Sequence, residues 1–145
     1  MGNAVEYFEF NLTDVGEIEI DRALPTACLI IADTREVTDL QVIVDKMITI
    51  GCTFFMSAGK YADGLEEQID SIVEGSDVYR SLGVVTTSHV GETPEDIVSF
   101  LFNATLPSET AIRCCVGYEE TATAVERFLA EARILASAGD PQLLG

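Results

Sequence analysis

Positively charged residues are scarce in this sequence. Only 8 of the 145 residues are Lys or Arg, against 25 Asp and Glu, which gives a formal net charge of −17 at pH 7. A surface this acidic repels nucleic-acid phosphates and anionic lipid headgroups. We therefore expect neither nucleic acid nor a membrane surface as a partner. The charge is typical of an acidic or salt-adapted soluble protein, and a surface matched to a basic protein partner is the alternative.

Residues that commonly bind metals or form disulfides are also few. The chain has a single histidine and no C-x-x-C pair, so we predict no structural metal site. Two of the four cysteines are adjacent, which would place them on opposite faces of a strand. We interpret all four as reduced, buried thiols of a cytoplasmic protein: Cys28, Cys52, Cys114 and Cys115.

Long apolar runs are absent as well. No stretch approaches 18 apolar residues, and the first ten residues lack a basic region followed by an apolar core. We therefore expect no membrane span and no signal peptide. The known nucleotide-binding patterns are missing too, because Tyr61 rather than Ser or Thr follows Lys60 and no G-x-G-x-x-G follows the first buried strand. We predict no cofactor.

What is present is a repeating pattern of strands and helices. A non-alternating apolar run at 27–32 predicts a strand covered on both faces, and further strands begin at 53, 83 and 111, each followed by apolar residues at helical spacing. Units of about 30 residues are typical of β-α-β repeats. The sequence predicts an α/β fold with three αβα layers and a four-stranded parallel sheet, with Rossmann- or flavodoxin-like order 2-1-3-4.

The remaining elements complete one predicted domain over 1–145, with a repeat core at 27–138. Alternating residues at 5–11 and 17–21 predict a β-hairpin or an edge strand within an N-terminal extension of 1–24. Three helix starts carry capping patterns: Thr38 with Gln41, Asp63 with Glu66, and Thr93 before Pro94.

Polar residues gather where the predicted strands end. The predicted strand order places its switch point between the strands at 27 and 83, where ligands bind in open parallel sheets. We therefore expect one crevice with Asp33 and Thr34 on one side and the loop after 83–87 on the other, flanked by the end of the middle strand. The expected ligand-binding residues are Thr34, Ser57, Gly59, Lys60, Thr86, Thr87 and Ser88.

His89 is the leading candidate for chemistry, because its ordinary pKa lies near neutrality. It could act as a general base oriented by Asp33 or Glu92, with Thr86 or Thr87 donating to a developing charge. The alternative is a loop histidine that bonds a backbone carbonyl or caps the next helix. Asp33 likewise either binds a ligand or caps its own turn.

The order of residues around His89 resembles a small bacterial α/β family with a T-T-x-H-x-x-E signature and no assigned activity. The matching residues are Gly59, Glu67, Asp70, Thr86, Thr87, His89, Glu92, Asp96 and Phe100. Ser88 stands where that family tends to have an aromatic residue. The resemblance implies a free-standing cytoplasmic domain of uncharacterised function.

Three functions are compatible with the sequence. The leading hypothesis is a non-enzymatic module that binds a protein partner or a small ligand, because no complete catalytic motif is present. The second is a small enzyme that uses His89 with Asp33 or Glu92 on a polar metabolite. The third is an acidic inhibitor or immunity-like protein that docks on a basic target. The oligomeric state is left open.

Overall fold

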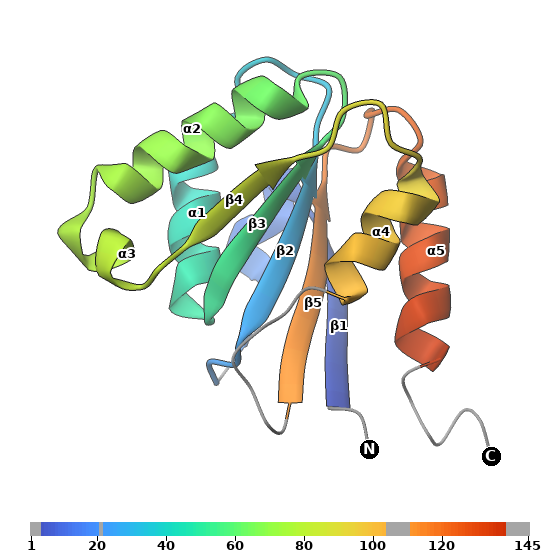
Figure 1. The fold of residues 1–145 in the computed structure, drawn as a ribbon, viewed down its shortest axis with the longest axis horizontal. Coiled ribbons are helices and arrows are strands. Elements are labelled where there is room, and N and C mark those ends of the chain that lie inside the picture. Colours follow the sequence, from blue (N-terminus) through green and yellow to red (C-terminus); the bar gives the residue numbers. More distant parts are fainter. Residues whose placement is uncertain (1–3, 21, 104–110, 139–145) are drawn as a thin grey trace.

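The computed structural model describes residues 4–20, 22–103 and 111–138; the ends of the predicted domain, 1–3 and 139–145, lie outside this range. Its centre is one open sheet of five parallel strands in the order β1-β5-β2-β3-β4 (Figure 1). The strands are β1 (Ala4–Asn11), β2 (Thr26–Ile31), β3 (Cys52–Ala58), β4 (Val85–Ser88) and β5 (Ala111–Tyr118).

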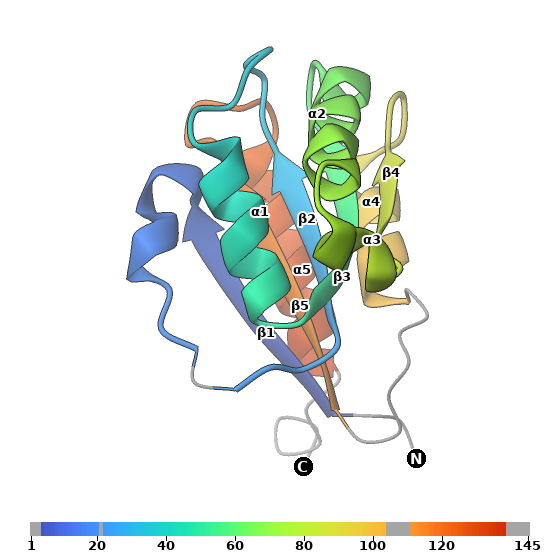
Figure 2. The same cartoon turned by 90° about the vertical axis from the view of Figure 1, so that its left-hand side faces the viewer.

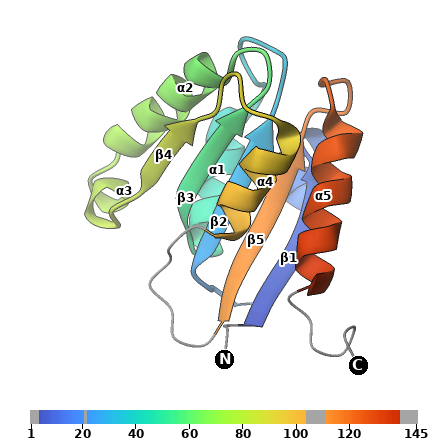
Figure 3. The same ribbon diagram turned by 45° about the vertical axis from the view of Figure 1, so that its right-hand side comes forward.

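Helices cover both faces of the sheet. On one face lie α1 (Leu40–Thr49), α2 (Ala62–Glu74) and the 3-10 helix η1 (Leu12–Glu17), with the short α3 (Asp77–Ser81) following α2. On the other face lie α4 (Pro94–Phe102) and α5 (Val125–Ala138). Figure 2 shows α1 in front of the sheet with α5 behind it, and Figure 3 shows α4 and α5 side by side.

The continuous apolar run of β2 follows from its central position. All six of its residues are buried. Cys28 and Ile30 pack into the core beneath α1 and α2, whereas Ala27, Leu29 and Ile31 pack into the core beneath α4 and α5. Successive side chains of a strand point to opposite faces of the sheet. A strand between two helical layers therefore has no solvent-exposed face, and its sequence shows no alternation of polar and apolar residues.

The predicted α/β class with a parallel sheet is confirmed, but the number and order of strands were wrong. The sheet has five strands, and the predicted four lie in the order β5-β2-β3-β4. From β2 the chain moves one strand outward at each of two crossovers, to β3 and then β4, and returns past β2 to form β5. Right-handed crossovers permit either path, so connection lengths alone did not distinguish them.

The N-terminal extension is an edge strand and not a hairpin. β1 pairs with β5 in parallel over eight residue pairs, so the chain must leave this edge before it enters β2. Within the alternating segment 17–21, Glu17 ends η1, while Ile18 and Ile20 pack against the core without forming a strand; position 21 lies outside the described residues. The alternation therefore marked a half-buried segment and not a second strand.

The capping predictions had mixed outcomes. Thr93 caps α4 as predicted, since its hydroxyl accepts a hydrogen bond from the amide of Asp96 at 3.1 Å. The other two patterns were wrong, because α1 starts after Asp39 and α2 after Tyr61, and neither residue provides a side-chain cap. Asp63 instead accepts a hydrogen bond from Ser88 of β4, so a tertiary contact replaces the local one.

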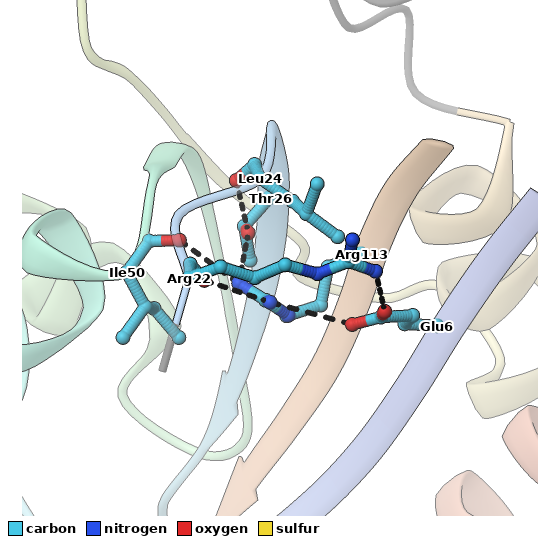
Figure 4. A network of polar contacts seen from close by, with 6 residues as sticks. All are labelled: Glu6, Arg22, Leu24, Thr26, Ile50 and Arg113. Carbon is cyan, nitrogen blue, oxygen red and sulfur yellow. Dashed lines mark hydrogen bonds and ion pairs between the residues drawn. The ribbon is translucent and has the colours of Figure 1, made fainter. Parts of the chain in front are cut away.

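A buried arginine joins the amino-terminal ends of the strands (Figure 4). Arg113 is 1% exposed, and its guanidinium donates to the carbonyls of Ile50 at 2.9 Å and Arg22 at 3.1 Å. It also reaches Thr26 at 3.4 Å and the carboxylate of Glu6 at 3.3 Å. This network holds the end of the sheet opposite to the strand ends described below.

The four cysteines are free and buried, as predicted. In the described ranges, none of the helices combines the length and apolar character needed to cross a bilayer.

Candidate functional site

A hollow of about 430 Å³ lies at the carboxyl-terminal ends of β2, β3 and β4. Its polar wall brings together residues from loops that are far apart in the chain, and Pro94, Ile97 and Phe128 provide an apolar floor. An apolar cavity with a few fixed polar groups is the usual form of a small-molecule site. The polar residues that line it are Asp33, Lys60, His89, Glu92, Thr123 and Arg127.

Contacts of the backbone and of the ring fix the position of His89. It is 7% exposed, and its backbone amide donates to the carbonyl of Ser57 at 2.9 Å, which ties the end of β4 to β3. Its ring nitrogen Nδ1 lies 2.9 Å from Oε2 of Glu92, and Nε2 lies 2.9 Å from Oγ1 of Thr87. The Phe100 ring packs beside the imidazole, with 5.3 Å between centroids.

These contacts define the protonation pattern of the neutral imidazole. An ionised carboxylate only accepts hydrogen bonds, so Nδ1 carries the hydrogen that faces Glu92 and Nε2 accepts from the Thr87 hydroxyl. On protonation Nε2 would donate to the same hydroxyl, since a hydroxyl both donates and accepts. Thr87, His89 and Glu92 therefore form a hydroxyl–imidazole–carboxylate chain that is satisfied in both charge states.

Asp33 occupies the same hollow but does not orient His89. Its oxygens accept hydrogen bonds from the amide of Lys60 at 2.8 Å and from the amide and hydroxyl of Thr123 at 2.7 and 2.8 Å. Partial burial acts to raise the pKa of Asp33, but the bonds from Thr123 and Lys60 outweigh it and lower that pKa. Asp33 thus fixes two other loops around the hollow.

Gly59 allows the loop after β3 to approach β2 closely. Its φ is +107°, and a Cβ atom at this position would lie 2.1 Å from the carbonyl oxygen of Ala32. Only glycine adopts such a conformation readily. The following residue, Lys60, consequently projects from a loop held against the end of β2.

The other predicted site residues lie outside this hollow. Thr34 donates to Glu119 and lines a separate hollow of about 540 Å³. Ser57 is fully buried, and its hydroxyl has no hydrogen-bond partner among the described residues. Thr86 and Ser88 donate to Asp70 and Asp63 of α2.

The expected single crevice is therefore divided. Because β3 lies between β2 and β4, the predicted switch point between those two strands was wrong, and the order reverses between β2 and β5. There Glu119 accepts hydrogen bonds from the Asp33 amide at 3.1 Å and from Thr34. Gly59 and Lys60, expected at the flank, occupy the centre.

The sequence predictions missed three residues that shape this region: Thr123, Arg127 and Arg35. Thr123 follows β5, and only the correct strand order would have placed that end beside Asp33. Arg127 lines the hollow from the first turn of α5 and pairs with Glu95 at 2.7 Å. Arg35 lies two residues beyond Asp33. Because basic residues are scarce in this chain, a cation so close to a strand end could have been singled out from the sequence.

A family model described as a domain of unknown function (DUF7684) matches residues 6–132. The chain belongs to the DUF7684 family. This confirms the predicted membership of a small uncharacterised family, whereas the bacterial origin and the T-T-x-H-x-x-E signature remain predictions. No curated protein and no solved structure matches the chain. The DUF7684 match runs from β1 into α5 and so includes every polar residue of the hollow.

Proposed function

We propose that this domain binds a small polar molecule in the hollow at the ends of β2, β3 and β4. The supporting observation is that Asp33 and His89, which come from different strand ends, line one cavity and are both fixed by hydrogen bonds. A site whose polar groups are already oriented loses little entropy when a ligand arrives. The buried ring of His89 also argues for use, since an apolar side chain would fill that space without the cost of burying polar atoms.

Further features of the chain support proposals about its location, its domain organisation and its partners. Four free, buried thiols fit a reducing cytoplasm, where we place the protein. The pairing of β1 with β5 supports a single domain in which 1–24 and 27–138 act together. The net charge of −17 supports a partner that is neither nucleic acid nor membrane.

A thermal-shift panel of sugars, nucleotides and small organic acids tests the proposal. A ligand at about 100 times its Kd adds about 2.7 kcal/mol to stability, which raises Tm by several degrees in a chain of this size. We expect at least one compound to stabilise the wild type and to lose this effect in His89→Asn. Gln41→Ala on α1, outside the hollow, serves as the control. A ligand that stabilises His89→Asn equally would reject the site.

Acid–base catalysis is a second candidate, favoured by the Thr87–His89–Glu92 chain. A carboxylate that orients an imidazole whose other nitrogen meets a hydroxyl is the arrangement of a general base and its positioning group. Thr87 does not line the hollow, so a reaction there requires Nε2 of His89 to exchange its bond with Thr87 for one with the substrate, while Glu92 positions the ring. Turnover of a stabilising compound, followed by NMR, should vanish in His89→Asn and fall in Glu92→Gln. Stabilisation without turnover leaves binding as the function.

A further inference from the structure

Two cations from different loops meet at one aromatic ring beside the hollow. The guanidinium carbon of Arg35, in the loop after β2, lies 4.9 Å from the centroid of the Tyr61 ring, and Nζ of Lys60, in the loop after β3, lies 5.5 Å from it. Arg35, Lys60 and Tyr61 line a cavity of about 420 Å³. Lys60 and Val90 line both this cavity and the hollow of His89, so the two adjoin.

The charges of Arg35 and Lys60 are unusual for this chain. Five of its eight basic residues form ion pairs with carboxylates: Arg22, Arg80, Arg113, Arg127 and Arg133. Among the described residues, neither Arg35 nor Lys60 forms an ion pair, although the chain contains 25 acidic residues and the carboxylate of Asp33 interacts electrostatically with Lys60. Lys46 on α1 is the third basic residue without an ion pair in the described ranges. Two like charges held at one ring repel each other, and an anion between them would relieve that repulsion.

The surroundings of the two cations favour an anion further. The hydrogen bond from Arg35 and the charge of Lys60 together lower the pKa of Tyr61. Tyr61 provides no side-chain cap for α2, and the first three residues of this helix, whose amides have no partner within the helix, line the same cavity. Asp63 is the one carboxylate among the residues lining the cavity, and it accepts a hydrogen bond from Ser88.

We propose that Arg35 and Lys60 form an anion site that holds a phosphate or carboxylate group of the ligand. This inference rests on the proposed function and specifies its ligand class: a small anionic metabolite whose charged group lies against Arg35 and Lys60 while its body enters the hollow of His89. A guanidinium binds two oxygens of such a group at once, and an ammonium adds a point charge. The chain's overall negative charge is screened beyond about 8 Å at physiological salt and does not prevent this contact.

Titration of the full chain with inorganic phosphate, and separately with acetate, tests the site by NMR at an ionic strength of about 0.15 M, where the Debye length is about 8 Å. Hydrogen bonds to charged groups contribute about 1.5–3 kcal/mol, so we expect Arg35→Gln and Lys60→Gln each to weaken the tighter-binding anion at least about tenfold. Lys46→Gln on α1 removes the same charge, and Lys46 lines neither cavity. This control should change affinity less than about twofold, as expected for long-range charge alone.

The outcomes separate the possibilities. Binding that depends on Arg35 and Lys60 supports the site. The anion that binds more tightly shows whether the site prefers a phosphate or a carboxylate group. Absence of binding by both anions, or equal weakening by Lys46→Gln, overturns it. A compound from the thermal-shift panel that requires His89 but neither cation would uphold the proposed function and reject the anion site. Phosphate binding through Arg35 and Lys60, with no ligand that requires His89, would uphold the anion site and reject the proposed function.

Discussion

Asp33 at the end of β2 accepts hydrogen bonds from both the amide and the hydroxyl of Thr123, which lies 90 residues further along the chain. Its other oxygen accepts the amide of Lys60. One carboxylate therefore joins the loop before α5 and the loop before α2 to the central strand. The shape of the hollow therefore depends on this side chain.

Replacing Asp33 by Asn should destabilise the protein by about 1–3 kcal/mol at pH 7, because an amide nitrogen would face donors where a carboxylate oxygen now accepts. Urea unfolding followed by circular dichroism measures the loss. Asp39→Asn, at an exposed residue before α1, is the matched control and should change stability little.

The cost of Asp33→Asn should also depend on pH. The pKa of Asp33 is lowered in the folded protein from its ordinary value of 3.8. Its ionised form therefore stabilises the fold fully above pH 3.8, and this contribution disappears as the pH falls through the lower folded-state pKa. The difference between wild type and Asp33→Asn should shrink on acidification. A difference that grows at low pH would contradict this account of Asp33.

Two glycines near the site should respond in opposite directions to alanine. Gly59→Ala introduces a Cβ into a positive-φ position and against the Ala32 carbonyl, so we expect a loss of more than about 2 kcal/mol. Gly64 lies inside α2, and a Cβ added there would have no atom within 4 Å apart from the neighbouring backbone of its own helix, so Gly64→Ala should stabilise by about 0.5–1 kcal/mol. Unfolding free energies of the pair provide the comparison.

The buried guanidinium should matter more than its carboxylate partner. Arg113→Lys leaves the carbonyls of Ile50 and Arg22 without their fork of donors, and we expect a loss of about 2–3 kcal/mol. The side chain of Glu6 is 44% exposed, so Glu6→Gln should cost less than about 1 kcal/mol. Denaturant titration of both variants measures the contrast. Equal losses would show that the ion pair, and not the carbonyl contacts, stabilises this end of the sheet.

The cysteines should be inert in the folded protein. Burial, together with the neighbouring Cys28, raises the pKa of the Cys114 thiol to about 12, and burial also raises the pKa values of Cys52 and Cys115. Because the thiolate is the reactive form, a thiol reagent at about pH 8 should modify the native chain very slowly. All four cysteines should react after unfolding in urea. Rapid modification of the native protein would reveal local opening of the core.

Elements with strong local signals could be predicted from the sequence, whereas relationships between distant elements could not. The unbroken apolar run of β2 indicated two covering layers, and Thr93 with Pro94 marked the start of α4, because these signals lie within a few residues. The placement of β5 beside β2 left no local signal, so the contact between Asp33 and Thr123 was missed. The Asp63 pattern failed for the same reason, since a β4 hydroxyl competes for its carboxylate.

In the site, too, contacts between residues close in sequence could be predicted, whereas contacts between distant segments could not. His89 and Glu92 are three residues apart and meet across one turn, as one of the sequence alternatives proposed. Their relation to Lys60 and Arg35 depends on three strand ends reaching one edge in an order that spacing does not encode.

The position of β1 sets an order on synthesis and folding. Among the described strands its one neighbour is β5, which ends at Tyr118, so β1 has no pairing partner until β2, β3, β4 and β5 have been made. Throughout that interval Phe8 and Phe10 lack the sheet against which they pack, and an unpaired apolar strand is prone to association with other chains. The carboxylates of Glu6 and Glu9 alternate with these rings. Their negative charges would repel the same segment of other chains and so oppose association while β1 is unpaired.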